Sequence, residues 1–350
     1  GYVGQLDEVV FQESLGTMRQ KTERIEKLAA FIAGEYGIDA AERADVERAA
    51  HLAKADLVTG AVVEFTSVQG IMGSYYAEAA GEAPRVAQAI ADHYRPRFSG
   101  DELPATAVGM AVACADKLDT ICGLFAVDQA PTGSSDPFAL RRAALGVLAM
   151  ADAGLRFSLT AAIDESLALF AAQGIAFDAA AVREAVVAFF LTRTTVMLRD
   201  EGVKADTIDA VLAAGVQEPS QLVARARALE AARQDAPEAF DDLATAFARA
   251  NNLRDGSLGV DFDEALLTEV DHALSSAVVQ AERRVAAALE ADDYATALDE
   301  LAALRKPVDL FFERVMVMDD DLDVRANRLR LLNRFVGVFA NVADFGLMAR

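Results

Sequence analysis

The sequence predicts an all-α fold, and three observations lead to that class. Apolar residues recur at intervals of three and four along most of the chain, which is the spacing of one helix face. No stretch alternates between apolar and polar residues for long enough to indicate a strand. Alanine, the strongest helix former, is abundant, whereas aromatic residues make up 7% and tryptophan is absent. At 350 residues the chain is long for one hydrophobic core, so more than one domain is expected.

The first half of the chain divides into helices at its glycines and prolines. An amphipathic helix is predicted over residues 9–32 and a second over 41–65. In the region that follows, residues 69–73 (QGIMG) indicate a tight interhelical turn in which glycines adopt positive φ. Further helices are predicted over 86–93 and 104–125.

The second half is delimited in the same way. One pair of helices is separated near Gly174, and its second member runs from Val182 to Met197. Two further helices begin at Pro219 and Pro237, because proline is tolerated in a first helical turn. Three long helices complete the chain, over residues 264–289, 294–318 and 324–347. The predicted segments are a helical domain, a helical connector and a helical bundle, over 1–155, 156–217 and 218–350.

Charge and cysteine content limit the classes of function. The net charge of −22 argues against binding nucleic acid over the whole surface, so RNA binding requires basic residues gathered on one face. Cys114 and Cys122 lie eight residues apart in an apolar helical run, which suits neither a zinc site nor a local disulfide and predicts buried thiols. No apolar run reaches the roughly 18 residues of a membrane helix, and no signal peptide opens the chain, which favours a cytoplasmic protein without a membrane partner. The first residue is Gly rather than Met, which suggests a piece of a longer protein.

A loop rich in helix breakers carries the most specific motif, PTGSSDPFALRR at residues 131–142. Asp136 is expected to cap the following helix and Pro137 to occupy its first position. Arg141 and Arg142 then project about 100° apart. Each of the two arginines either pairs with an internal acid or contacts RNA or another subunit.

This motif resembles a signature of the beta subunit of bacterial heterotetrameric glycine–tRNA ligases. Matching segments lie on both sides of it, so the resemblance extends nearly from end to end. They are LVT at 57–59, EF at 64–65, QGIMG at 69–73, YA at 76–77, GE at 81–82, ADKLDT at 115–120, EGV at 201–203, IDAVLA at 208–213 and VMVM at 315–318.

The resemblance implies the C-terminal half of a subunit that works in an enzyme of alpha and beta subunits. ATP-dependent activation of glycine is then expected on the alpha subunit, together with ATP and Mg²⁺. This chain is expected to hold no cofactor and no catalytic residue, and its expected partners are glycine tRNA and the alpha subunit. The chain contains no nucleotide-activation motif, which agrees with that division.

The first segment also resembles the HD phosphohydrolase fold, in which a His-Asp pair and outlying His and Asp residues hold a divalent metal. Asp56 and Asp116 fall at Asp-type ligand positions, but Ala55 stands where the paired histidine belongs. Of the nearby histidines, His51 and His93, the first would need a different geometry. The resemblance therefore implies a degenerate site without a metal, whose carboxylates bond to helix ends or neighbouring polar groups.

The predicted last helix inverts the charge balance, with five basic residues and one acid from 324 to 350. The segments VMVMD at 315–319 and RANRL at 325–329 resemble the helical anticodon-binding domain shared with arginyl-tRNA synthetases. The acidic run 319–321 lacks the spacing of a calcium loop and predicts a capping turn. The candidate tRNA-binding residues are Arg141, Arg142, Arg305, Lys306, Arg314, Arg325, Asn327, Arg328, Arg330 and Arg334. The alternative for each arginine is an ordinary salt bridge on a solvated helix.

Two other classes of function compete with tRNA binding. A metal-dependent phosphohydrolase would use Asp56 and Asp116, and a structural adaptor would bridge subunits without contacting RNA. Salt separates the adaptor from an RNA-binding protein, because phosphate contacts weaken steeply with ionic strength whereas apolar interfaces do not.

Overall fold

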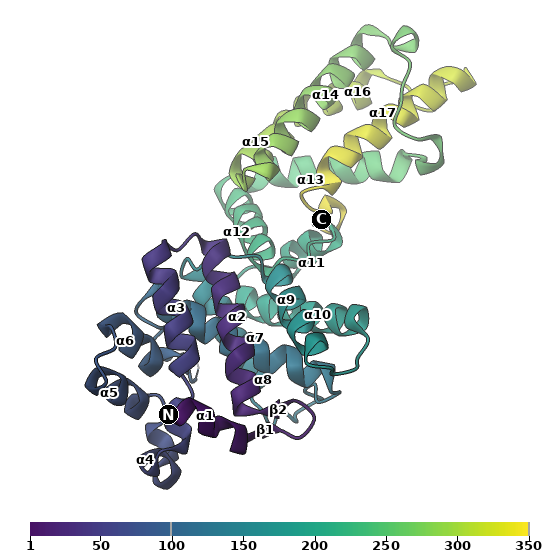
Figure 1. The fold of residues 1–350 in the computed structure, drawn as a ribbon. Helices are drawn as coiled ribbons and strands as arrows, with labels where there is room; N and C mark the ends of the chain where they lie inside the picture. The colour runs from purple at the N-terminus through teal and green to yellow at the C-terminus, as the bar shows by residue number, and fades with distance from the viewer. Residues whose placement is uncertain (99, 349–350) are drawn as a thin grey trace. The chain divides into compact units, whose positions relative to one another are not determined.

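A computed structural model describes residues 1–98 and 100–348 and confirms the all-α class (Figure 1). The chain forms two compact units. The first unit comprises 1–194 with 218–220, and the second comprises 195–217 with 221–350. The predicted connector, 156–217, is thus shared between the units, and the division of the sequence into three segments stays a prediction.

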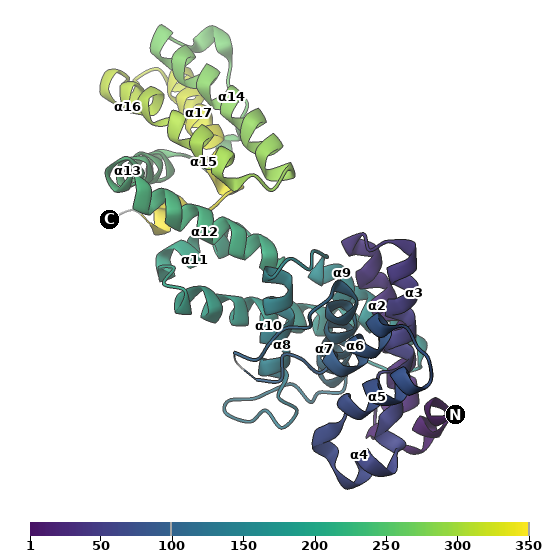
Figure 2. The ribbon, with the colours of Figure 1, turned by 90° about the vertical axis from the view of Figure 1, so that its left-hand side faces the viewer.

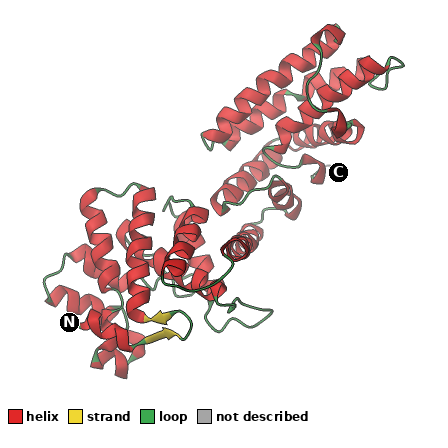
Figure 3. Cartoon of the chain, turned by 45° about the vertical axis from the view of Figure 1, so that its right-hand side comes forward, coloured by secondary structure: helices red, strands yellow, loops and turns green. Residues whose placement is uncertain are grey.

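The first unit is built from short and long helices, with one small ribbon beside α2. Its helices are α1 (Tyr2–Gln5), α2 (Met18–Tyr36), α3 (Ala40–Leu52), α4 (Gly60–Glu64), α5 (Ile71–Ala79), α6 (Pro84–Asp92), α7 (Ala107–Ala126), α8 (Leu140–Asp152), α9 (Leu159–Ala172) and most of α10 (Ala179–Asp200), with 3₁₀ turns η1 (Leu6–Glu8), η2 (Ala55–Val58) and η3 (Thr66–Val68). Two strands, β1 (Val10–Gln12) and β2 (Gly16–Thr17), pair antiparallel (Figure 3).

Helix α7 is the centre of this unit. It packs against α2, α3, α6, α8 and α9, which lie close around it in Figure 2. Its residues from Ala111 to Ala126, Thr120 apart, are all buried, which explains the nearly continuous apolar sequence of this helix. Cys114 and Cys122 lie on α7 as free, buried thiols, as predicted, and burial raises the pKa of each to about 12.

The second unit is a helical bundle with an aromatic core. It contains α11 (Ala205–Ala213), most of α12 (Pro219–Asp235), α13 (Pro237–Leu253), α14 (Glu269–Glu290), α15 (Tyr294–Ala303), α16 (Arg305–Arg314) and α17 (Leu322–Ala340), with 3₁₀ turns η4 (Gly256–Leu258), η5 (Glu264–Leu266) and η6 (Phe345–Leu347). Helix α17 packs against α13 and α14. Phe247, Phe339 and Phe345 form the centre of the core, with ring centroids 5.2–6.1 Å apart.

Polar side chains fix the starts of most long helices, as the capping rule requires. Thr17 and Gln20 form a capping box at α2, and Thr268 and Asp271 form another at α14. Single caps at α3, α7, α9, α15 and α17 are supplied by Asp39, Thr106, Ser158, Asp293 and Asp321. The predicted capping role of the run 319–321 is therefore confirmed, as are the helix starts at Pro219 and Pro237.

Four predicted helices are interrupted in the structure, and one of them is the last, predicted over 324–347, which ends at Ala340 before the 3₁₀ turn η6. The first predicted helix begins at Met18 rather than near residue 9, because the β-ribbon lies within residues 10–17 and its Gly16 adopts a φ of 91°. The helix predicted over 294–318 is two helices that meet at Leu304. Pro307 explains this break, since it has no N–H to donate to the preceding turn and is tolerated only in the first turn of α16.

The helix predicted over 41–65 is also wrong. It ends at Leu52, and the chain then forms η2 and the short helix α4. The break turns Lys54 and Asp56 into the protein, where their exposed fractions are 2% and 1%. Tertiary contacts therefore override a continuous helical pattern here.

The loop motif differs from prediction at one residue. Asp136 caps α8 as expected, since its carboxylate accepts hydrogen bonds from the backbone N–H groups of Leu140 and Arg141 at 2.8 and 3.0 Å. Pro137, however, lies in a turn, and α8 begins three residues later. Ala139, with a φ of 55°, separates the turn from the helix.

We expect Gly123→Ala to destabilise the first unit by about 1–3 kcal/mol, as overpacking does. A Cβ at this position of α7 would lie 2.5 Å from Cζ of Phe170 and 3.0 Å from Cδ1 of Leu15. Gly34→Ala is the matched control, because a Cβ there meets nothing within 4 Å and alanine favours the helix by up to about 1 kcal/mol. Thermal unfolding followed by circular dichroism measures both. A Gly123→Ala protein as stable as Gly34→Ala would contradict the packing of α7.

Candidate functional site

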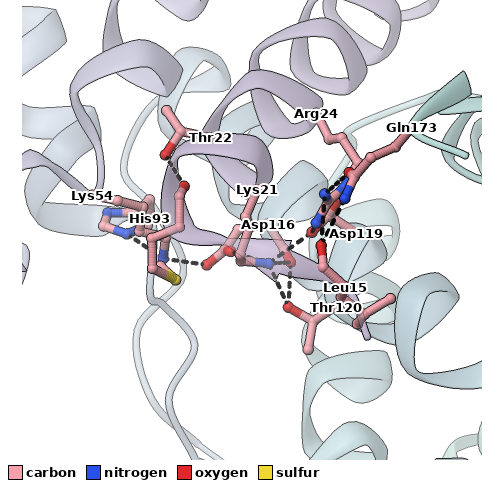
Figure 4. Close-up of polar contacts among 11 residues, drawn as sticks. Leu15, Lys21, Thr22, Arg24, Lys54, His93, Asp116, Asp119, Thr120 and Gln173 are labelled. Atoms are coloured by element: carbon pink, nitrogen blue, oxygen red, sulfur yellow. Dashed lines mark hydrogen bonds and ion pairs between the residues drawn. The ribbon is translucent and has the colours of Figure 1, made fainter. Parts of the chain in front are cut away.

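A buried polar centre lies between α2, η2, α6 and α7 in the first unit (Figure 4). Lys21 and Arg24 are three residues apart on α2, and Asp116 and Asp119 are three apart on α7, so each pair shares one helix face. The packing of α2 on α7 brings two cations against two carboxylates. All four side chains are buried.

Asp119 is the more enclosed carboxylate of the centre. Arg24 donates to both of its oxygens, with Nε at 2.6 Å and Nη2 at 3.2 Å. Lys21 Nζ donates to Asp119 Oδ2 at 3.0 Å and also lies 3.0 Å from Asp116 Oδ1. The guanidinium of Arg24 stacks over Phe170, 4.1 Å from the ring centroid. A buried group of ions of this kind is stable only when all of its members are present, because an ion left alone would be buried without a compensating charge.

Asp116 also pairs with Lys54, and Lys54 links the polar centre to His93. Lys54 Nζ donates to Asp116 Oδ2 at 2.8 Å and lies 2.9 Å from His93 Nε2. Although burial opposes the charge of Asp116, Lys21 and Lys54 hold the pKa of its carboxyl well below its usual range. Burial and the nearby Lys54 lower the pKa of His93 to about 3, so its imidazole is neutral. Its Nδ1 then donates to the carbonyl of Ile90 at 2.7 Å.

Asp56 is held at the start of α5. Its Oδ2 accepts hydrogen bonds from the backbone N–H groups of Gly70 and Gly73, at 2.6 and 2.9 Å. Burial raises the pKa of Asp56, and the two amides oppose that rise. Gly70 has the predicted positive φ of 79°. Gly73 is explained differently, because a Cβ there would lie 2.9 Å from Ile90 Cγ2 and 3.0 Å from Asp56 Oδ2.

These contacts show how far the degenerate positions Asp56 and Asp116 fit a divalent ion. Asp56 binds a helix start and Asp116 binds two lysines, while His51 pairs with Glu26 at 3.1 Å, away from both. Within the ranges 1–98 and 100–348, no three His, Cys, Asp or Glu side chains gather as a metal site. The ammonium group of Lys54 lies between His93 and Asp116, so this arrangement does not fit a metal.

A cavity of about 670 Å³ opens beside the polar centre. Asp116, Lys117 and Phe138 line it, and Arg142 from α8 lies at its edge. The exposed Arg142 donates to the carbonyl of Arg97 at 3.1 Å. Arg141 turns elsewhere and donates to the carbonyl of Gly133 at 2.6 Å. The two arginines thus diverge as their spacing predicts, and each contacts a carbonyl rather than an acid.

In the second unit, the start of α17 is held to the preceding acidic turn. Arg325 donates from Nε and Nη2 to the carbonyl of Asp319, at 2.8 and 2.5 Å. Arg328 donates from Nη1 to Asp319 Oδ2 at 2.7 Å and to the carbonyl of Met316 at 2.9 Å, and its Nε lies 3.5 Å from Asp271 Oδ1. A backbone N–H from Asp321 and the pairing with Arg328 lower the pKa of Asp319.

The next residues of α17 hold the segment 254–268 against the bundle. Asn327 accepts from the N–H of Asp263 at 2.7 Å and donates to its carbonyl at 2.9 Å. Arg330 donates to the carbonyl of Leu258 at 3.2 Å, and Asn333 donates to the carbonyls of Asp255 and Gly259. Sequence reasoning missed Asn333 and Asp271, since a lone asparagine or aspartate in a helix is usually solvated. Arg334 pairs with Glu282 at 2.6 Å.

The remaining candidates lie on α16 and differ in their exposure. Arg305 pairs with Asp242 and lies 3.7 Å from Asp309. Lys306 and Arg314 are exposed, and the described part of the chain offers neither an ion pair nor a hydrogen bond to these side chains. Exposed Met316 and Met318 follow in the turn before α17, with exposed fractions of 73% and 51%. Arg350 lies outside the described residues.

The ten predicted residues therefore fall into three groups. Asn327 and Arg328 are buried and occupied by the protein itself, with exposed fractions of 1% and 6%. The partly buried or paired group is Arg141, Arg305, Arg325, Arg330 and Arg334. The exposed group is Arg142, Lys306 and Arg314.

Comparison with known proteins gives two family matches. The model described as "Glycyl-tRNA synthetase beta subunit" matches residues 1–213, and the model described as "DALR anticodon binding domain" matches residues 243–345. No helix within the described ranges is long and apolar enough to cross a membrane.

Curated relatives match over nearly the whole chain. It is 44% identical over 350 residues to the glycine–tRNA ligase beta subunit of Actinobacillus pleuropneumoniae serotype 5b (strain L20), an alignment of 98% of this chain and 50% of the relative. The Moorella thermoacetica subunit is 44% identical over 348 residues, with the same coverage. That of Vibrio cholerae serotype O1 (strain O395) is 43% identical over 350 residues, 99% of this chain and 50% of the relative. The chain spans about half the length of these curated relatives.

We expect Asp119→Asn to cost about 3–5 kcal/mol of stability, because it leaves Lys21 and Arg24 buried without their shared carboxylate. Glu23→Gln is the control, since the exposed pair of Arg19 and Glu23 contributes at most about 0.5 kcal/mol. Urea unfolding of both variants measures the difference. Equal stability of the two proteins would show that the centre is not a coupled ion-pair network.

The neutral, buried His93 predicts a pH dependence. Its pKa is about 3 in the folded chain and 6.5 in a model peptide, so the unfolded chain binds the extra proton as the pH falls below about 6.5. Stability should therefore decline from pH 7 to pH 5 with a slope approaching 1.4 kcal/mol per unit. His93→Gln keeps an acceptor for Lys54 but does not titrate, so its slope should be smaller by that amount. Identical slopes in urea unfolding would contradict the burial of a neutral imidazole.

Proposed function

The chain belongs to the glycyl-tRNA synthetase beta-subunit family, of which it represents a C-terminal region, and on this premise we propose that it binds glycine tRNA for the attachment of glycine. The second unit is the proposed anticodon-binding part, and the first unit supports it. Glycine activation, with its ATP and Mg²⁺, takes place on the alpha subunit in this proposal. The alpha subunit is then the protein partner, and the complex works in the cytoplasm.

One observation carries this proposal. The anticodon-binding family match covers 243–345, and this region holds Lys306 and Arg314, which are exposed cations without an internal partner in the described chain. Elsewhere on α16 and α17 the arginines are held by acids or carbonyls. Phosphates require accessible positive charge, so these two residues are the first candidates for contact with the tRNA backbone.

The exposed methionines after α16 suggest a second kind of contact. Met316 and Met318 lie in the turn that Arg325 and Arg328 hold through Asp319. Unpaired anticodon bases present apolar faces, and single-stranded RNA is bound largely by packing against such faces. In this proposal Arg325 and Arg328 are positioning residues for the turn, and Asn327 positions the segment around Asp263.

The two alternatives have less support. A phosphohydrolase would require Asp56 and Asp116 for a metal, but Lys54 and the α5 amides occupy these carboxylates. A structural adaptor would not require exposed cations in the region of the anticodon-binding match. Arg142 at the cavity edge is the exposed candidate of the first unit, and it is proposed as a secondary RNA contact.

We expect Lys306→Ala/Arg314→Ala to weaken binding of glycine tRNA and to reduce the salt slope of log K by about 2, one unit for each lost phosphate contact. The control is Arg284→Ala, which removes an exposed cation of the same unit that Glu300 already pairs at 3.2 Å. Fluorescence anisotropy across a salt series measures both variants against the unaltered chain.

A second tRNA, changed only in its anticodon, identifies the surface. If the unit reads the anticodon, the unaltered chain prefers the native tRNA, and Met316→Ser/Met318→Ser reduces that preference. Equal binding of both tRNAs with an unchanged salt slope in the Lys306→Ala/Arg314→Ala protein would reject the proposal and favour the adaptor.

A further inference from the structure

We propose that the first unit contains a cation-binding site that the chain fills with its own ammonium group, that of Lys54, and that removal of this group turns His93 and Asp116 into ligands of a divalent metal. The site is independent of the proposed tRNA contacts of Lys306 and Arg314, because it lies inside the first unit. Its basis is the set of donor atoms that surround Lys54 Nζ.

The orientation of His93 is the first argument. Its Nδ1 lies 2.7 Å from the carbonyl of Ile90, which can only accept, so Nδ1 carries the proton. Nε2 therefore directs a lone pair at Lys54 Nζ, 2.9 Å away. Metal-binding histidines are commonly arranged in this way, with one ring nitrogen donating to a backbone carbonyl and the other facing the metal.

The carboxylates supply the second argument. Asp116 Oδ2 accepts from Lys54 Nζ at 2.8 Å, and Asp56 attracts the same ammonium electrostatically. Asp56 Oδ1 is buried and, within the described chain, has no hydrogen-bond donor, although Oδ2 is held by two amides. The ring of Tyr94 covers another side, with its centroid 3.9 Å from Nζ. A nitrogen, carboxylate oxygens and an aromatic face all favour positive charge at this point.

The dimensions allow an ion to replace the ammonium. Zinc-type ions bind nitrogen and oxygen at about 2.0–2.2 Å. The two donors at 2.8 and 2.9 Å would each need to move inward by less than about 1 Å. The cavity of about 670 Å³ is lined by Asp116 and Tyr94, so it offers space for water beside this carboxylate.

The test is titration of Lys54→Ala with Co²⁺ alone, followed by calorimetry and by visible absorption of the bound ion. We expect one equivalent to bind at least about tenfold more tightly than to the unaltered chain, and the second change His93→Ala to abolish this gain. Lys21→Ala is the matched control. It also removes a lysine from Asp116, but it leaves Lys54 in place and exposes no histidine lone pair. It should gain no site.

Folding provides a second readout. If Lys54→Ala is unfolded or has a lower Tm, Co²⁺ should raise its Tm or restore its helical circular dichroism, since binding to the native state stabilises it. The same ion should have no such effect on Lys54→Ala/His93→Ala. Lack of Co²⁺ binding by a folded Lys54→Ala, lack of rescue of an unfolded one, or equal binding by Lys21→Ala would each overturn the proposal.

Discussion

The structure of the first unit depends on the neutralisation of one buried carboxylate, that of Asp116. It faces Lys21 on α2 and Lys54 in the break after α3, at 3.0 and 2.8 Å. An uncompensated charge at this depth is far costlier than any single apolar contact, so both lysines must reach it. That requirement fixes the register of α2 on α7, and it also forces the chain to leave the helical path at residue 53. Apolar packing of alanine-rich helices permits several registers, whereas this arrangement of charges is satisfied in only one.

The same requirement explains which parts of the fold the sequence predicted. Helix identity follows from local spacing, and α7, α9, α13 and α17 were recognisable from it. The break between α3 and α4 was not, because residues 41–65 keep a helical pattern and only the distant partners of Lys54 and Asp56 reverse it. The break at Leu304 had a local signal, since Pro307 lies three residues beyond it. The β-ribbon had none, because its strands are too short to show alternation.

For the candidate sites, spacing identified residues that share a face but not whether that face is covered. Arg325 and Arg328 do share a face of α17, yet the acidic turn covers it, and Arg328 is almost completely buried. The segment 254–268 covers the neighbouring face through contacts of its carbonyls with Asn327, Arg330 and Asn333. Backbone carbonyls carry no sequence signal, so no reading of residue types could have revealed this cover. Exposure separates Arg142, Lys306 and Arg314 from the other candidates, and exposure is a property of the fold.

The strong negative charge of the chain gives these internal pairings a consequence for recognition. With 55 acidic and 33 basic residues, many arginines are held by a carboxylate or carbonyl, and in the proposed function the exposed cations of the second unit determine where RNA phosphates bind. In this proposal the net negative charge of the chain disfavours phosphate over most of the surface, which restricts where RNA binds and in which orientation. A basic protein would bind RNA in many registers and would need base contacts to choose among them. An acidic protein with a few exposed cations excludes the wrong registers by repulsion, and base contacts then need to discriminate only within the one that is left.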